Sequence, residues 1–195
     1  MNSRRAFLAA AATPLLYPVV EHFGKPSSPA RTDDGRRLPN VALETHDGRQ
    51  VRFYDDLVKG RLIVVNMMYA GCINLCPPNT ANLLRVQEAL KSRIGRDVFM
   101  YSLTLQPAID KPSDLRRYMD KFGIGPGWTF LTGAPAEVEL LRRRLGFYTL
   151  DAAEDADLSA HTGMLRIGHD ARDRWSMIPA LATPRQIINS ISNYF

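Results

Sequence analysis

The stretch Leu62-Ile-Val-Val-Asn-Met-Met-Tyr-Ala-Gly-Cys-Ile-Asn-Leu-Cys-Pro-Pro78 decides the fold. Residues 62–68 form an apolar run of strand length, which is typical of a strand buried on both faces. The two prolines that close the stretch are typical of the first turn of a helix. The stretch therefore predicts a buried strand that leads through two cysteines into a helix.

Cys72 and Cys76 are the only cysteines among the 195 residues of the chain. Their spacing predicts that they share one face of a helical turn, close enough to hold one soft metal ion or to form a small disulfide. A disulfide that only staples a loop is an alternative, although so short a ring restrains the unfolded chain little. Because a helix N-terminus lowers the pKa of a thiol, we expect Cys76 to lose its proton more easily than Cys72.

The N-terminus reads Asn2-Ser-Arg-Arg-Ala-Phe-Leu8, which is typical of a twin-arginine export signal. The paired Arg4 and Arg5 precede an Ala-rich apolar stretch that is short for a membrane span. We therefore expect residues 1–30 to be a signal segment and linker, and the protein to act in the oxidising periplasm. Removal of the segment and its retention as an inner-membrane anchor both remain open.

Residues 31–195 are expected to form one domain with its own core. The net charge of +5 for the whole chain indicates a mildly basic surface and not a nucleic-acid binding protein. The basic cluster Arg142-Arg-Arg144 lies among leucines at helical spacing, which favours a solvated helix face.

Strand and helix patterns alternate along this domain. We expect strands at 41–44, 50–53, 62–68, 98–105, 129–131, 162–168 and 174–178, the first two joined by an Asp47-Gly48 turn. We expect helices from Pro77 to Gly95, from a Ser113 cap to Gly123, over 135–146, and from Thr183-Pro184 onward, with an acidic loop at 151–157. The order predicts an α/β fold, with a central mixed sheet flanked by helices and an N-terminal hairpin extension. In such a sheet ligands bind beyond the carboxyl ends of parallel strands, where the two cysteines lie.

Several motifs together carry a resemblance to a known family. They are Cys-x-x-x-Cys-Pro at Cys72 to Pro77, Ser102-Leu-Thr-Leu-Gln-Pro107 followed by Asp110 and Pro112, Tyr118-Met-Asp-Lys-Phe122, Leu131-Thr-Gly133 and the lone His161. Over residues 40–195 the chain resembles the Sco/SenC family, thioredoxin-fold proteins that carry copper to the dinuclear site of cytochrome c oxidase and related centres. The resemblance implies a thioredoxin-like fold for the domain.

The resemblance also implies a metal site made of Cys72, Cys76 and His161. Thiolates favour cuprous ion and an added imidazole suits cupric ion, so this set can hold copper in either oxidation state. Disulfide formation would use the same sulfurs and would empty the site. A lone histidine is by itself more often an ordinary polar residue. For His22, His46 and His169 we expect no ligand role.

Three methionines could add thioether ligands, but their place in strand patterns favours core packing: Met67, Met68 and Met164. The chain departs from the family pattern at positions that are usually Pro-Asp between the cysteines, Asp before the histidine, and Asp-Pro after the second long strand. These positions hold Ile73 and Asn74, Ala160, and Gln106-Pro107. Because carboxylates are missing at these positions, the copper affinity and the identity of the protein that receives the copper are open.

Two classes of function follow. The first is a metallochaperone without turnover, which receives copper from an upstream periplasmic donor and delivers it to the apoprotein of a copper enzyme. The second is a thiol-disulfide oxidoreductase, in which Cys72 and Cys76 are the catalytic pair and reduce the copper-site cysteines of a partner. The wider Cys-x-x-x-Cys spacing and a third ligand candidate favour the first. A peroxiredoxin-like peroxidase fits less well, because Met68-Tyr-Ala-Gly71 lacks the Thr and Pro expected ahead of a peroxidatic cysteine.

Overall fold

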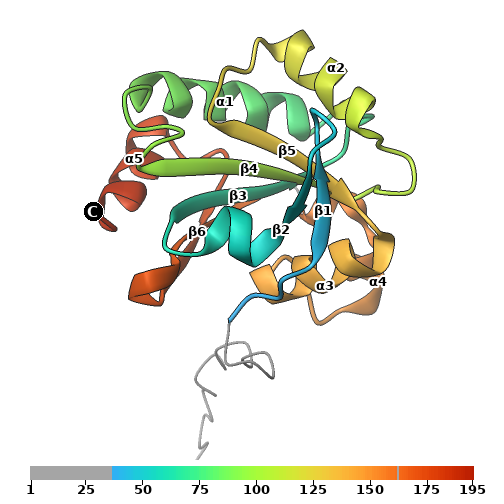
Figure 1. The fold of residues 1–195 in the computed structure, drawn as a ribbon. Helices are drawn as coiled ribbons and strands as arrows, with labels where there is room; N and C mark the ends of the chain where they lie inside the picture. Colours follow the sequence, from blue (N-terminus) through green and yellow to red (C-terminus); the bar gives the residue numbers. More distant parts are fainter. Residues whose placement is uncertain (1–36, 162) are drawn as a thin grey trace, which may run out of the picture.

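The computed structural model describes residues 37–161 and 163–195, which form a mixed sheet covered by helices on both faces (Figure 1). The expected export segment, with Arg4, Arg5 and His22, lies outside the described residues. The sheet has the strand order β2-β1-β5-β4-β3-β6-β7. Its strands are β1 (Ala42–Thr45), β2 (Gln50–Arg52), β3 (Leu62–Met68), β4 (Val98–Thr104), β5 (Trp128–Gly133), β6 (Met164–His169) and β7 (Arg174–Pro179).

The centre of the sheet is parallel and its two sides are antiparallel. Strand β3 pairs in parallel with β4, and β4 in parallel with β5. The hairpin of β1 and β2 adds to β5 antiparallel, and the hairpin of β6 and β7 adds to β3 in the same way. All seven residues of β3 are buried, as the apolar run predicted. The predicted mixed sheet and both hairpins are confirmed.

Two apolar layers hold the helices on the sheet. One face carries α1 (Cys76–Ala89), α2 (Pro112–Phe122) and α5 (Pro184–Ser192), whose buried side chains include Leu83, Leu115 and Ile187. The other face carries α3 (Pro135–Leu145) and the short π-helical turn η1 (Phe53–Val58). Both cysteines belong to the first layer. They therefore lie on the face of the sheet that α1, α2 and α5 cover.

The helix boundaries follow local rules in most places. Gly123 ends α2 in the left-handed region with φ 64°, as predicted, and Thr183 caps α5. Three expectations were wrong. Helix α1 ends at Ala89 instead of continuing to Gly95, because the chain turns there to enter β4. The residue before α2 is Lys111 and not Ser113, since Pro112 already occupies the first helical position.

The third wrong expectation concerns the acidic stretch 151–157, which is not an open loop. It forms the short helix α4 (Ala152–Ala156), and the Asp151 carboxylate accepts hydrogen bonds from the N–H groups of Ala153 and Glu154. A 3-10 turn, η2 (Leu158–His161), follows it directly. Among the described residues no helix has the length and apolar character that crossing a membrane requires.

Candidate metal and thiol site

The two cysteines lie beyond the carboxyl end of β3, where the topology predicted a site. Cys72 is in the loop that follows the strand, and its N–H donates to the carbonyl oxygen of Tyr69 at 3.1 Å. Cys76 is the first residue of α1, and its N–H donates to Cys72 Sγ at 3.2 Å. Both thiols are free and buried. Only Cys76 is helical, so the expectation that both lie on one helical turn was wrong, although the loop still brings them together.

The environments of the two thiols differ, and the difference reverses the expected order of acidity. Burial, together with a hydrogen bond to Cys72, raises the pKa of Cys76 to about 12. Burial opposes ionisation of Cys72 as well, but hydrogen bonds from Cys76 and from the Tyr69 phenol lower its pKa below the usual value. Cys72 is therefore the thiol that ionises first, because hydrogen bonds favour its thiolate whereas burial opposes ionisation of Cys76.

Tyr69 and Asp110 support the cysteine loop. The Tyr69 phenol hydrogen-bonds to the Cys72 thiol, which raises the pKa of the phenol to about 12. Asp110 is buried, and its Oδ2 accepts from the Ala70 N–H at 2.9 Å and from Thr104 Oγ1 at 2.5 Å. Its charge contributes to the raised pKa of Cys76. Neither residue was a sequence candidate for the site; a carboxylate in the loop after a neighbouring parallel strand was the available signal for Asp110.

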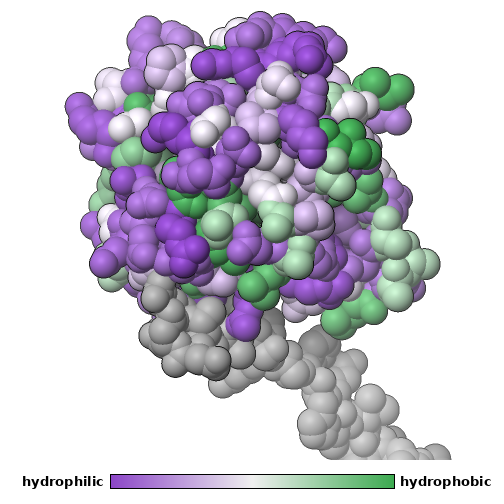
Figure 2. Space-filling view, turned by 45° about the vertical axis from the view of Figure 1, so that its right-hand side comes forward, coloured by the Kyte–Doolittle hydropathy of each residue, from purple (hydrophilic) through white to green (hydrophobic). Residues whose placement is uncertain are grey.

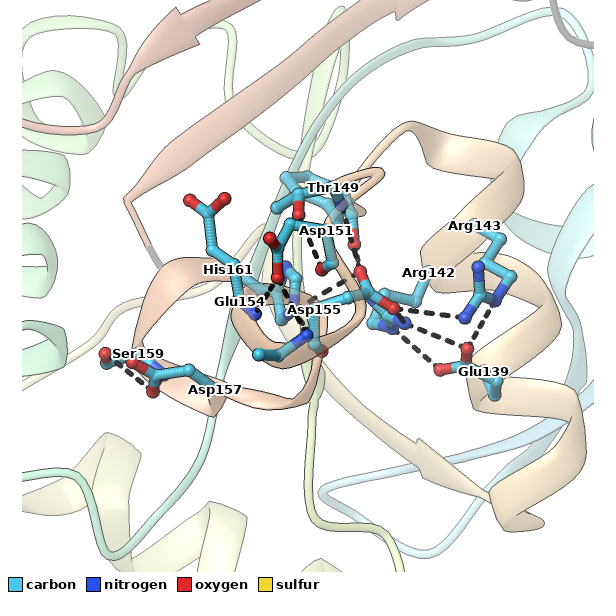
Figure 3. Close-up of polar contacts among 12 residues, drawn as sticks. Glu139, Arg142, Arg143, Thr149, Asp151, Glu154, Asp155, Asp157, Ser159 and His161 are labelled. Atoms are coloured by element: carbon cyan, nitrogen blue, oxygen red, sulfur yellow. Dashed lines mark hydrogen bonds and ion pairs between the residues drawn. The ribbon is translucent and has the colours of Figure 1, made fainter.

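His161 lies at the end of η2, and it forms no metal-binding cluster with the two cysteines. It is buried, and its Nε2 lies 2.8 Å from the carbonyl oxygen of Asp155 and 3.2 Å from Arg142 Nη1 (Figure 3). Across residues 37–161 and 163–195 no three His, Cys, Asp or Glu side chains are gathered closely enough to hold a metal ion. The third ligand implied by the resemblance is thus placed apart from the thiol pair in this conformation.

Arg142 is the residue for which the sequence interpretation was most clearly wrong. It was expected on a solvated helix face, but it is buried and forms bidentate ion pairs with Asp155 and Glu139. The guanidinium holds the pKa of Asp155 far below its usual value. A single sequence could not reveal this, because Asp155 reaches Arg142 only through the fold.

The three methionines agree with the expected core packing. Met67 and Met68 are fully buried in the core, and Met164 packs partly buried against it. His46 accepts a hydrogen bond from the Phe130 N–H, and burial lowers its pKa. His169 ends β6, where burial also lowers its pKa.

Comparison with known proteins decides the family. A family model described as SCO1/SenC matches residues 37–195. The chain belongs to the SCO1/SenC family. The SCO1 protein homolog of Bacillus subtilis is 30% identical over 99 residues, which are 50% of this chain and 50% of that protein. Protein sco1 of Schizosaccharomyces pombe is 25% identical over 173 residues, which are 83% of this chain and 65% of that protein. The chain thus spans between half and two thirds of the length of these SCO1 relatives.

Solved structures of SCO1/SenC proteins share the fold. A SCO1/SenC family lipoprotein of Bacillus anthracis superposes with a TM-score of 0.63 at 21% identity, covering 80% of this chain and 93% of that one. The ScoI protein of Bradyrhizobium japonicum, solved with copper bound, gives 0.62 at 22% identity, covering 79% and 96%. The predicted thioredoxin-like fold is confirmed.

Proposed function

We propose that this protein is a periplasmic copper carrier, which binds one copper ion through Cys72, Cys76 and His161 and delivers it to a respiratory copper enzyme such as cytochrome c oxidase. Family membership supports the proposal, as does the copper bound to the related ScoI of Bradyrhizobium japonicum. The related BsSco is described as a member of a family of cytochrome c oxidase assembly proteins, which supports the choice of recipient.

The observation that carries the proposal is the pair of free, buried thiols joined by the 3.2 Å contact between Cys76 N–H and Cys72 Sγ. Two thiolates in a dry setting are the soft ligands that cuprous ion prefers. Cys72 provides the first thiolate, because its pKa is already lowered. Cys76 gives up its proton as the metal binds, so loading releases protons and is favoured at higher pH.

A second function remains supported by a specific observation, the unequal acidity of the thiols. If the protein is an oxidoreductase, the Cys72 thiolate attacks a disulfide of the partner. A mixed disulfide forms, and one thiolate of the partner is released. The Cys76 sulfur, after losing its proton, would then displace the second partner thiolate. The partner gains two electrons, and Cys72 and Cys76 end as a disulfide.

Anaerobic titration of the reduced full-length protein with cuprous and cupric copper distinguishes the two functions. A carrier binds one copper per chain, with a sulfur-to-copper charge-transfer band in the cupric form, and a variant without both cysteines binds none. His161→Ala is expected to weaken cupric binding by about tenfold or more, as loss of a metal-site group does. His46→Ala is the matched control and should bind as the wild type does. If the protein binds no copper but exchanges disulfides rapidly with a partner, it is instead an oxidoreductase.

Export is part of the proposal and rests on Arg4 and Arg5. Replacing both with lysine keeps the charge but removes the paired guanidinium groups. We expect the double variant to accumulate in the cytoplasm, while the unaltered chain is recovered from the periplasm or its inner membrane. Equal periplasmic recovery of the two chains would contradict export by this signal.

A further inference from the structure

A cavity of about 540 Å³ lies at the end of the sheet that is remote from the cysteines. Its lining includes Arg61, Arg96 and Gly127, which come shortly before β3, β4 and β5 in the chain. The cysteines instead follow the carboxyl end of β3. A strand rises about 3.3 Å per residue, so the length of β3 separates the cavity from the thiols by about 20 Å. The cavity is therefore distinct from the proposed copper site.

The floor of the cavity is apolar and aromatic. Val51, Leu57 and Tyr101 line it as buried members of the second apolar layer, and Phe99 packs partly buried against that layer. The Tyr101 hydroxyl already donates to the carbonyl oxygen of Leu57 at 2.9 Å. The volume lies within the range of small-molecule sites. Such a floor suits a small apolar or aromatic body.

The polar part of the lining carries an excess of positive charge. Three guanidinium groups, those of Arg49, Arg61 and Arg96, line the cavity together with a single carboxylate, that of Asp56. The Asp56 carboxylate is engaged, because its Oδ2 accepts from the Arg52 N–H at 2.6 Å. The lining thus has two more positive than negative groups, which favours an anion.

Arg61 is the best placed of the three arginines. It is half-buried, and its Cζ lies 4.7 Å from the centroid of the Phe99 ring, so the ring holds its guanidinium in place. Arg61 Nη1 donates to the carbonyl oxygen of Asp56, and within residues 37–161 and 163–195 no carboxylate forms an ion pair with it. A guanidinium has five N–H donors, so Arg61 can still bind an anion through two of them.

Arg49 and Arg96 are held only by exposed ion pairs. Arg49 pairs with Asp47 at 3.0 Å and Arg96 with Asp97 at 2.8 Å, and neither aspartate lines the cavity. Exposed pairs of this kind contribute little to stability. Both arginines can therefore turn toward a bound anion at small cost.

We propose that this cavity binds an organic phosphate, a phosphate monoester attached to a small apolar or aromatic body. A phosphate monoester carries a charge of about −1.5 to −2 at pH 7, which matches the excess of positive groups. Arg61 donates two hydrogen bonds to the phosphate oxygens, while Arg49 and Arg96 add charge from the rim. The apolar body rests on Phe99 and the buried side chains of the floor. The proposal does not depend on copper binding.

Titration of the ¹⁵N-labelled, reduced full-length protein with phenyl phosphate tests the site by NMR. We expect saturable shifts that concentrate on the amides of Gly95 and Gly127, which line the cavity. Phenyl phosphate should bind about tenfold more tightly than inorganic phosphate, because only the ester can cover the apolar floor. Benzyl alcohol, which has a ring but no charge, should not bind measurably.

Substitutions assign the anion to the arginines. Arg61→Gln should weaken binding of phenyl phosphate about tenfold, as loss of a bidentate charged contact does. Arg96→Gln, an exposed change that does not endanger the fold, should weaken it about threefold. Arg117→Gln is the matched control: Arg117 is an exposed arginine of α2 that pairs with Asp114 at 3.0 Å and does not line the cavity. It should bind as the wild type does.

The outcomes that overturn the proposal are specific. They are shifts that do not saturate, equal affinities for phenyl phosphate and inorganic phosphate, and equal weakening by Arg117→Gln and Arg96→Gln. Vesicles of phosphatidylglycerol, added as competitor, then identify the source of the phosphate. If they displace phenyl phosphate from the wild type, the ligand is a lipid headgroup; if they do not, it is a soluble ester. The double change Cys72→Ser and Cys76→Ser should leave the binding unaltered, which separates this site from the copper proposal.

Discussion

At the scale of single residues, the site is governed by hydrogen bonds to sulfur and to one buried carboxylate. Cys72 accepts from the Cys76 N–H and from Tyr69, whereas Cys76 is more deeply buried and has a raised pKa. Asp110 holds the backbone of Ala70, two residues ahead of Cys72. The chemistry of each thiol thus depends on its neighbours and not on its place in the motif.

Cys72 should react with alkylating reagents before Cys76. The thiolate is the reactive form, and a lower pKa gives more thiolate at a given pH. Brief iodoacetamide treatment of the reduced protein between pH 7 and 9, followed by peptide mass spectrometry, should find the label mainly on Cys72. Tyr69→Phe removes a hydrogen bond that lowers the Cys72 pKa and should slow the labelling. Preferential labelling of Cys76 would show that the assigned order of acidity is incorrect.

Replacing Asp110 should destabilise the fold, and the loss should be larger when the variant side chain has no oxygen to accept hydrogen bonds. Asp110→Ala leaves the Ala70 N–H and the Thr104 hydroxyl without their shared acceptor, at a cost of about 1–3 kcal/mol for each buried group that stays unpaired. Asp110→Asn keeps one oxygen in place and should cost less. Urea unfolding of the reduced proteins measures both changes. Equal stabilities for the two variants would argue against the hydrogen-bonding role.

At the scale of elements, caps and anchoring contacts decide which parts of the chain are firmly held. Helix α5 has a reciprocal capping box between Thr183 and Gln186 and two buried isoleucines. Helix α4 buries nothing and depends on the polar cluster of Glu139, Arg142, Arg143 and Asp155. The space-filling view shows that hydrophobic residues on the face turned toward the viewer form separate small groups among hydrophilic ones (Figure 2). Mobility should therefore concentrate in α4 and η2 and not in α5.

Thr183→Ala should lower the free energy of unfolding by about 1 kcal/mol, the usual cost of losing a helix cap. The Thr183 hydroxyl accepts from the Gln186 N–H at 3.3 Å, and the Gln186 side chain accepts from the Thr183 N–H at 2.9 Å. Asn189→Ala, an exposed change within the same helix, serves as the control and should stay within about 0.5 kcal/mol of the wild type. The prediction fails if thermal or urea unfolding places both variants at the same stability.

At the scale of the whole molecule, the central parallel strands fix the cysteines while peripheral ion pairs fix the segment that carries His161. The cysteine loop follows the fully buried β3, with helices of one layer packed around it. His161 contacts Arg142 of α3, a helix that packs in the opposite layer. The two parts of the proposed copper site thus belong to regions of different local stability.

Acid should destabilise the protein through its carboxylates. The pKa values of Glu139, Asp155 and Asp157 are lowered, the first two mainly by Arg142 and the last by Ser159. The unfolded chain therefore binds more protons than the folded one at low pH. Stability from these groups is fully present above their ordinary pKa values near 4 and is lost as pH falls below them.

Denaturant unfolding of the wild type and Asp155→Asn between pH 7 and 2 checks this expectation. The variant should be less stable at pH 7, because Arg142 loses a charged partner. The gap between the two proteins should narrow as pH falls, since the Asp155 carboxylate takes up a proton in the unfolded wild type while the folded wild type keeps it ionised. A gap that stays constant down to pH 2 would be inconsistent with a lowered Asp155 pKa.

Local patterns in the sequence determined the architecture of the fold and the cysteine pair of the candidate site. The apolar run of β3, the turn at Gly48, the stop at Gly123 and the cap at Thr183 depend on neighbouring residues, so one chain sufficed to predict them. The pairing of Cys72 with Cys76 was equally local. Resemblance to a family then supplied the copper hypothesis and the candidate third ligand.

Tertiary structure alone decided what surrounds those residues. The burial of Arg142, its pairing with Asp155, the position of His161 and the support of the cysteine loop by Asp110 join residues between 13 and 40 positions apart in the chain. Burial and charge pairing set pKa values and free energies over a few ångströms of space, whatever the sequence separation. The order of acidity of the two thiols, and the hold on His161, therefore became visible only in the folded molecule.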